Sequence, residues 1–193
     1  MSEMQAKQNK TRRNLTIVIA AAICIALSYG LSFIKLFSMP AGGSVTAASM
    51  LPLSLFAYLF GPWWGILAGI VYGLLQLIQK PEIVHWAQLL LDYPLAFGAI
   101  GLAGVTMKMR FKEGVASMFG LPIGVVIGGA GRLFCHVASG AIFFAEYAGD
   151  QNPWLYSFLY NGPYLGVDIA ICVALAFLIP VNPIAKILEI DQE

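Results

Sequence analysis

Long uninterrupted runs of apolar residues constrain the fold of this chain more than any other feature of its sequence. Residues 15–36 and 155–179 are apolar on nearly every face of a helix, whereas the strands of a membrane β-barrel alternate polar and apolar residues. An α-helix needs roughly 20 apolar residues to cross a bilayer. These runs therefore predict membrane-spanning helices, and a composition of 59% hydrophobic and 11% charged residues is typical of the same class.

The length of the chain limits how many such helices it contains. Its 193 residues allow about six spans with short connections and leave no room for a separate soluble domain. We expect residues 1–193 to form one integral membrane domain, an all-α bundle of six transmembrane helices with breaks at clusters of Gly and Pro. The predicted spans cover residues 15–36, 45–60, 63–78, 84–107, 115–144 and 155–179.

The basic residues predict the orientation of these helices in a cell membrane. If both termini are cytoplasmic, eight of the 11 Lys and Arg residues lie inside, Lys35 and Lys80 lie outside, and Arg132 lies within a span. Cytoplasmic loops carry an excess of Lys and Arg, so the sequence favours this orientation. The residues assigned to the cytoplasmic side are Lys7, Lys10, Arg12, Arg13, Lys108, Arg110, Lys112 and Lys186.

Polar residues inside the predicted spans are the first indication of function. These residues are Asp92, Arg132, His136 and Asp168. An Asp or Arg near the centre of a membrane helix costs roughly 2.5 to 3.5 kcal/mol on insertion scales, so such residues are rarely kept without a use. One interpretation is that Arg132 pairs with Asp168 or Asp92 only to hold helices together. That interpretation accounts less well for His136 and for a second carboxylate.

Helical spacing places these residues on shared faces. In the fifth span, residues at intervals of four form one oblique stripe, which consists of Arg132, His136, Gly140 and Phe144. A lone His or Tyr in such a place usually makes an interhelical hydrogen bond, but several polar faces together predict a binding cavity. The other two faces are His85, Gln88 and Asp92 in the fourth span, and Asn161, Tyr164 and Asp168 in the sixth.

The predicted cavity combines a carboxylate, a histidine and an amide with aromatic rings. A carboxylate and aromatic faces together hold a desolvated organic cation. Trp63, Trp64 and Trp86 stand at the ends of spans, and we interpret them as membrane-interface residues instead. The aromatic residues in or near the outward half are Tyr93, Phe144, Tyr147, Trp154, Tyr156, Tyr160 and Tyr164.

The sequence around these positions resembles the thiamine-specific substrate-binding S-component family of energy-coupling factor (ECF) vitamin transporters. The resemblance rests on the stretch 132–144, on the stretch 156–162, on Leu91-Asp92-Tyr93 and on the loop 39–44. It implies a six-helix fold, an outward-facing site built from the fourth to sixth helices, and a lid formed by the loop after the first helix.

The resemblance also implies how the cavity binds thiamine. Asp92 would be the acidic partner of the thiamine rings, and Phe144 would stack on one of them. Some relatives carry Glu at the first position and Trp at the second, but the thiazolium ring is a fixed cation that needs a counter-ion or a π-face in either case. The other expected contacts are polar groups of Tyr93 and Asn161, the ring-pocket residues His136, Gly140 and Tyr156, and the adjacent Arg132 and Tyr164.

Uptake requires an energy source outside this chain. The sequence contains no G-x-x-x-x-G-K-[ST] phosphate loop, so it does not hydrolyse ATP by that route. The resemblance implies a complex with a transmembrane coupling protein and two ATPase subunits. Ala22 and Ala26 form a small-xxx-small face on the first helix that lets another helix approach closely. We interpret this face as the docking site, although the same pattern also serves packing within a bundle.

Two other functions fit parts of the pattern. An intramembrane enzyme would use His136 as a base, but the adjacent Cys135 is turned away by about 100° of helix, and no H-E-x-x-H or G-x-S-x-G motif supports catalysis. A proton-coupled secondary transporter of a small organic cation would use Asp92, Asp168 and His136, but the sequence shows no inverted repeat.

We therefore expect a binding protein in the lipid bilayer, with thiamine as its ligand and with no catalytic residue, metal or cofactor. A net charge of +1 argues against a nucleic-acid partner.

Overall fold

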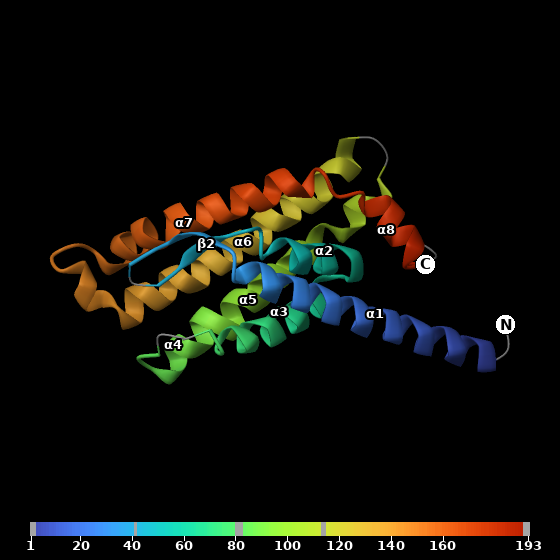
Figure 1. Cartoon of the computed structure of the whole chain (residues 1–193), viewed down its shortest axis with the longest axis horizontal. Coiled ribbons are helices and arrows are strands. Elements are labelled where there is room, and N and C mark those ends of the chain that lie inside the picture. Colours follow the sequence, from blue (N-terminus) through green and yellow to red (C-terminus); the bar gives the residue numbers. More distant parts are fainter. Residues whose placement is uncertain (1–2, 41, 80–82, 113–114, 191–193) are drawn as a thin grey trace.

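The computed structural model describes residues 3–40, 42–79, 83–112 and 115–190. The described chain is an elongated bundle of helices with one short two-stranded hairpin (Figure 1). This architecture confirms the predicted all-α membrane fold class. The uninterrupted helices of the bundle are α1 (Glu3–Ser32), α2 (Leu51–Phe60), α3 (Pro62–Gln76), α6 (Val115–Phe143) and α7 (Pro153–Ala176). The other helical segments are α4 (Trp86–Leu90), η1 (Leu91–Leu95), α5 (Ala96–Ala99), η2 (Ile100–Phe111), η3 (Ala145–Ala148) and α8 (Val181–Ile187).

Within the described residues, four helical segments are long and apolar enough to cross a membrane, and they correspond to the first, fourth, fifth and sixth predicted spans. α2 and α3 stand where the second and third spans are expected. They have 10 and 15 residues, or about 15 and 22 Å of helix, which is less than the roughly 30 Å of a hydrocarbon core. Helices thus occur at all six predicted places, with two of them short. The four long segments are Lys7–Ser32, Trp86–Arg110, Ser117–Phe143 and Pro153–Ala176.

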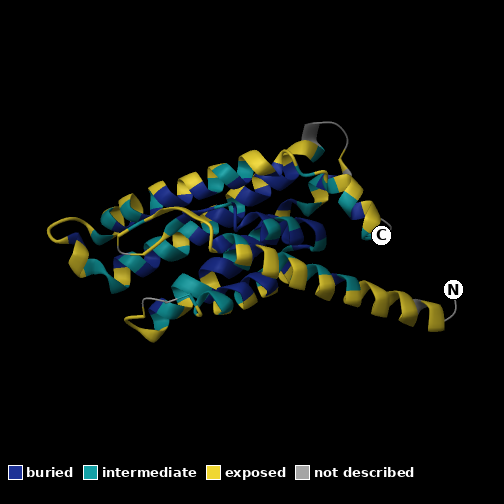
Figure 2. Cartoon of the chain, in the orientation of Figure 1, coloured by how far each residue is buried: buried dark blue, intermediate teal, exposed yellow. Residues whose placement is uncertain are grey.

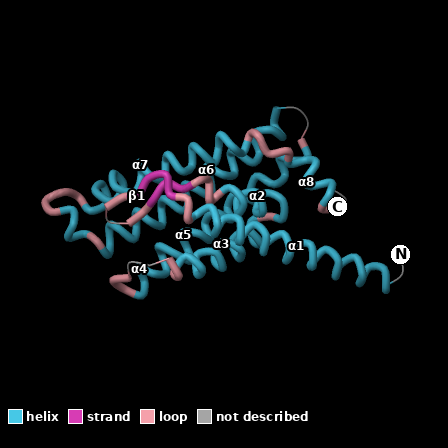
Figure 3. The backbone as a smooth tube through the Cα atoms, viewed as in Figure 1, coloured by secondary structure: helices cyan, strands magenta, loops and turns pink. Residues whose placement is uncertain are grey.

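A hairpin replaces the predicted helix at residues 35–36 and 45–46. It consists of the antiparallel strands β1 (Lys35–Ser38) and β2 (Ser44–Thr46), with an irregularity in β1 between Lys35 and Phe37. Gly42 and Gly43 have φ angles of 84° and 86°, a conformation that glycine adopts without strain and that forms the turn. The strands lie beside α7 (magenta in Figure 3).

The helix between residues 86 and 110 changes its winding where the sequence contains Pro94. Proline has no backbone N–H and disfavours the regular hydrogen-bond pattern. Here the backbone N–H of Ala96 donates to the carbonyl of Leu91, five residues earlier, so η1 is a π-helix. Such wide turns are rare and occur often at functional sites. Asp92 and Tyr93 both lie in this turn.

Glycines bring the following segment η2 close to α2 and α3. A Cβ atom at Gly101 would overlap the backbone of Ile66, and one at Gly104 would overlap Pro62. Close backbone approach at small residues is typical of helix packing in membranes. The core beneath is apolar, with Phe56 and Ile100 almost fully buried. This packing fixes the position of the preceding π-turn.

Stretches of α1 and α7 are exposed on the outside of the bundle (Figure 2), and large apolar side chains account for much of this exposed surface. Examples are Ile23 and Leu27 of α1 and Leu159 of α7, each more than half exposed. Such a surface is suited to lipid, since it would be unfavourable in water. Both ends of the chain lie at the same end of the bundle (Figure 1), where Arg12 and Glu189 form an ion pair with an N–O distance of 3.3 Å.

Candidate ligand-binding site

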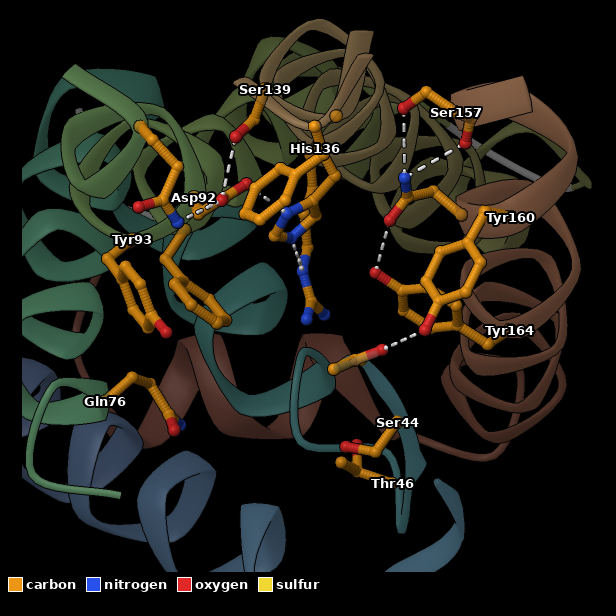
Figure 4. A pocket seen from close by; sticks show the side chains of 18 of the residues that line it. Ser44, Thr46, Gln76, Asp92, Tyr93, His136, Ser139, Ser157, Tyr160 and Tyr164 are labelled. Atoms are coloured by element: carbon orange, nitrogen blue, oxygen red, sulfur yellow. Dashed lines mark hydrogen bonds and ion pairs between the residues drawn. The ribbon is translucent and has the colours of Figure 1, made fainter. Parts of the chain in front are cut away.

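A cavity of about 340 Å³ opens among the hairpin, α3, the α4–α5 segments, α6 and α7. The hairpin and α4 lie in the half of the bundle away from the chain ends, whereas α6 and α7 run along its length (Figure 1). Figure 4 shows Asp92 and His136 on one side of the open centre, Tyr164 on another, and Ser44 opposite them. The volume lies within the range of small-molecule sites.

Asp92 is the acidic group of the cavity and is held by three hydrogen bonds. Its Oδ2 accepts from Nε2 of Gln88 at 2.7 Å and from Oγ of Ser139 at 2.8 Å. Its Oδ1 lies 3.0 Å from Nδ1 of His136. A carboxylate has about four lone-pair positions, so roughly one remains on Oδ1 for a donor on a ligand. The side chain is 18% exposed, which leaves it accessible from the cavity.

His136 connects Asp92 to a buried ion pair. Nε of Arg132 donates to Nε2 of His136 at 3.4 Å, so the proton of a neutral ring lies on Nδ1, which then donates to Asp92. Nη1 of Arg132 lies 3.4 Å from Oδ2 of Asp168. The guanidinium carbon also lies 4.7 Å from the ring centroid of Phe97, a cation–π contact. Arg132 therefore has a fixed place in the cavity wall.

Asn161 of α7 has an orientation set by its neighbours. Its Nδ2 donates to the carbonyl of Ser157 at 3.0 Å and lies 3.3 Å from Oγ of the same residue. The hydroxyl of Tyr164 donates to its Oδ1 at 2.8 Å. Gly140 faces this group from α6, and a Cβ atom there would overlap Oγ of Ser157. Glycine thus keeps the wall thin where α6 and α7 approach.

The β1–β2 hairpin covers the cavity next to α7. The hydroxyl of Tyr160 donates to the carbonyl of Gly42 at 3.0 Å. A Cβ atom on Gly43 would lie 2.6 Å from the ring of Tyr164, so only glycine lets the turn rest on that ring. Val45 is buried against Tyr164 and Leu165. These contacts hold the hairpin over one edge of the site.

All nine residues predicted to form the site line this one cavity, although they come from three separate segments of the chain. They are Asp92, Tyr93, Arg132, His136, Gly140, Phe144, Tyr156, Asn161 and Tyr164. The predicted aromatic residues Tyr147 and Tyr160 line it as well. Their roles in binding remain a prediction.

Three further residues that the sequence placed on or near the cavity faces do not line the cavity. His85 lies outside the lining: it precedes α4 in an extended conformation, accepts from the backbone N–H of Ala87 and stacks on Phe143. Trp154 is half exposed, at the start of α7. Asp168 is fully buried and forms an ion pair with Arg132. Of the predicted polar face of α7, Asn161 and Tyr164 therefore line the cavity and Asp168 does not.

Several residues that line the cavity were not predicted from the sequence. Ser139 follows His136 by three positions, so the stripe on α6 already indicated its face. Nothing in the sequence indicates that α3, which carries Gln76, borders the fourth to sixth spans. The resemblance did imply a lid from the loop after the first helix, and Ser44 belongs to the loop 39–44 that carries it. Other lining residues that were not predicted are Ser32, Lys35, Thr46, Ser49, Tyr72 and Gln79.

The fold and the cavity define a multi-pass helical membrane protein with a cavity of polar and aromatic lining, of a size suited to a small molecule. Residues 18–187 match the family model described as Thiamine transporter protein (Thia_YuaJ). The chain therefore belongs to the thiamine transporter family, as the resemblance predicted. This membership confirms the expectation of a transport protein and argues against the intramembrane enzyme.

Individual relatives support the same assignment over nearly the full chain. The chain is 35% identical to thiamine transporter ThiT of Bacillus subtilis over 196 aligned positions, covering 97% of this chain and 98% of the relative. It is 29% identical to thiamine transporter ThiT of Lacticaseibacillus paracasei, covering 78% and 79%.

Solved structures show the same fold. The structure of ThiT from Listeria monocytogenes superposes with a TM-score of 0.70 at 27% identity, covering 92% of this chain and 96% of that one. The S component of a bacterial ECF transporter superposes with a TM-score of 0.54 at 20% identity, covering 94% and 99%. The second likeness concerns the fold alone.

Proposed function

We propose that this chain is the high-affinity thiamine-binding subunit of an ECF-type importer and that the cavity beside Asp92 is its binding site. The observation that carries the proposal is a carboxylate with an unused acceptor position, facing a cavity with aromatic walls. Thiamine offers a fixed cation and an aminopyrimidine that donates hydrogen bonds. A carboxylate and π-faces are suited to both groups. The names and full-length similarity of the relatives support the same ligand.

The arrangement suggests a division of roles within the site. Asp92 accepts from the ligand, His136 orients Asp92 and lines the ring pocket, Asn161 presents an amide whose direction is already fixed, and Phe144 and Tyr156 supply ring faces. Because these groups are held before the ligand arrives, little side-chain entropy is lost on binding, and this favours high affinity. Phe144 and Tyr147 are 6.1 Å apart between ring centroids, beside the outer part of the cavity.

Partner ATPases would supply the energy. The exposed face with Ala22 and Ala26 on α1 is where we place the transmembrane coupling protein. We also propose that both termini are cytoplasmic: the segments that carry the excess of Lys and Arg gather at the end of the bundle where the chain begins and ends (Figure 1), and positive charge favours that side. The cavity would then open outward.

Isothermal titration of thiamine into the purified protein tests the proposal. Calorimetry is preferable to tryptophan fluorescence because all four tryptophans lie in the described chain and none lines the cavity. We expect saturable binding at nanomolar to micromolar concentration. Asp92→Asn keeps the shape but removes the charge and should weaken binding by about 10- to 100-fold, since hydrogen bonds to charged groups contribute about 1.5 to 3 kcal/mol.

Asp150→Asn is the matched control, because Asp150 is exposed and outside the cavity lining, and it should bind like the wild type. Folded wild-type protein that gives no heat with thiamine, or an Asp92→Asn variant with full affinity, would contradict the proposal. Uptake into vesicles by this chain alone, driven by a proton gradient, would support the proton-coupled transporter of an organic cation instead.

A further inference from the structure

Asp168 is a buried carboxylate behind the cavity that no step of ligand binding uses directly. Its side chain has no exposed surface, and it lies on α7, four residues after Tyr164. The backbone N–H and the hydroxyl of Thr46 in β2 donate to its Oδ1 at 2.9 and 3.0 Å. Nη1 of Arg132 lies 3.4 Å from its Oδ2. The carboxylate thus accepts from three donor groups, and only Arg132 among its partners is charged.

Besides Lys35 of the hairpin, the charged residues at the cavity are a closed ion pair, Arg132 with Asp168, and the carboxylate of Asp92. A buried charge without a partner is strongly destabilising, so the negative charge of Asp168 and the positive charge of Arg132 neutralise each other. The donors to Asp92 are an amide, a hydroxyl and a histidine ring. Because Nε2 of that ring accepts from Arg132, the ring is neutral. Asp92 therefore keeps its full negative charge toward the cavity.

Arg132 lies close enough to Asp92 that the two charges must be kept apart if Asp92 is to bind a cation. Its guanidinium contacts His136, which in turn contacts Asp92 (Figure 4). Only one imidazole ring therefore separates Arg132 from the ligand-facing carboxylate. If Asp168 did not hold the guanidinium, Asp92 would be the nearest negative charge in this chain of contacts. Arg132 would then compete with a cationic ligand for Asp92 and repel that ligand directly.

We propose that Asp168 is a positioning and specificity-determining residue: it keeps Arg132 paired away from Asp92 and so gives the cavity its preference for a singly charged organic cation. This inference rests on the proposed function, because the cation it concerns is thiamine. Asp168 touches no ligand and acts through Arg132. Its bonds to Thr46 also tie the charge pair to the base of the hairpin, so the pair and the cavity cover share one buried group.

The test compares thiamine with its neutral isostere, in which a thiophene ring replaces the thiazolium, by calorimetric titration of four proteins. These are the wild type, Asp168→Asn, Arg132→Gln and the double variant. Asn keeps an oxygen for Thr46 and replaces the charged oxygen that faces Arg132 with an uncharged NH2 group. The readout is the ratio of the two dissociation constants, isostere over thiamine, because a merely structural change weakens both ligands equally and leaves this ratio constant.

We expect Asp168→Asn to lower the ratio by on the order of tenfold, since an unpaired cation in a site of low dielectric acts on the charged ligand alone. Arg132→Gln should raise the ratio, and the double variant should return it toward the wild-type value. If Asp168→Asn does not fold, Arg132→Gln and the double variant still decide the question through the same ratio.

Three results would overturn the inference while leaving thiamine binding intact: a constant ratio in all four proteins, equal loss of both ligands in Asp168→Asn, or a double variant no different from Asp168→Asn. Absence of thiamine binding by folded wild-type protein would instead overturn the proposed function, and this inference with it. Asp150→Asn serves as the control for a general charge effect and should leave the ratio unchanged.

Discussion

At Gly140 the backbone of α6 comes so close to α7 that a single methyl group has no space. The Cβ atom of an alanine would overlap Oγ of Ser157 and lie 3.6 Å from Nδ2 of Asn161. Both groups belong to the network that orients the amide toward the cavity. The smallest possible substitution here therefore changes the geometry of a polar contact as well as the packing.

We expect Gly140→Ala to reduce thiamine affinity at least tenfold and to lower stability, because overpacking typically costs about 1 to 3 kcal/mol. Titration calorimetry and thermal unfolding in detergent measure the two effects. Gly166→Ala, on the exposed side of α7 with no atom within 4 Å of the added Cβ, is the matched control and should change neither. Unaltered affinity in Gly140→Ala would show that Asn161 and Ser157 adjust without loss.

The residues of the site were predictable where one helix carries several of them. Intervals of four on α6 group Arg132, His136 and Gly140 correctly, because a helix repeats nearly every four residues. The same reasoning links Gln88 to Asp92, and the two side chains are in fact hydrogen-bonded. Thr46 was not predictable as the partner of Asp168, because their contact joins positions 122 residues apart.

At the scale of elements, the turn and the base of the hairpin are held over the cavity by different contacts. At the turn, the carbonyl of Gly42 accepts a solvent-exposed hydrogen bond from the hydroxyl of Tyr160 in α7. The base is tied more firmly, through the buried bonds from Thr46 to Asp168. This difference suggests that the tip can open while the base stays in place.

Tyr160→Phe removes the hydroxyl and retains the ring. We expect thiamine to dissociate about two- to tenfold faster, since a hydrogen bond of this kind contributes about 0.5 to 1.5 kcal/mol, whereas the association rate should change little. Stopped-flow displacement by an excess of unlabelled ligand gives the rate. As the control, Tyr29→Phe removes a hydroxyl from α1 outside the cavity lining and should leave the dissociation rate unchanged. If thiamine dissociates from Tyr160→Phe at the same rate as from Tyr29→Phe, the bond from Tyr160 to Gly42 does not retain the ligand.

The elements themselves were predictable to different degrees. The long apolar runs gave α6 and α7 nearly to their ends, because hydropathy alone distinguishes a membrane helix. The hairpin was not predicted, because its strands overlap the end of the first predicted span and the start of the second. An apolar residue such as Val45 fits a helix and a strand equally well. The π-turn η1 was not predicted, although Pro94 marks the place where a regular helix is disturbed.

At the scale of the whole molecule, α1 presents an outer face with no neighbour in the described chain. Ala22, Ala26 and Gly30 are exposed at intervals of four, and a Cβ atom on Gly30 would meet nothing within 4 Å. Small residues in this arrangement let a second helix approach closely. The sequence predicted the motif, but only the fold shows that it faces outward.

Replacing both Ala22 and Ala26 by Trp should leave thiamine binding unchanged and reduce ATP-dependent uptake by the assembled transporter more than tenfold, because two bulky rings keep a partner helix away. Binding is measured by calorimetry and uptake in proteoliposomes that contain the coupling protein and ATPases. Ala170→Trp, on the exposed face of α7, controls for bulk at the lipid surface. Normal uptake by the double variant would place the docking surface elsewhere.

The wide turn at residues 91–95 has a consequence for the helix that contains it. In a regular α-helix each residue advances by about 100°, so a π-turn, which holds one residue more, rotates everything after it by about that amount. The carboxylate of Asp92 points to the cavity, whereas Gly101 and Gly104 point to α2 and α3. One extra residue thus acts as a phase shift, which together with the 3-10 winding of η2 sets the angle between the cavity-facing carboxylate and the two glycines to a value that a uniform α-helix would not give.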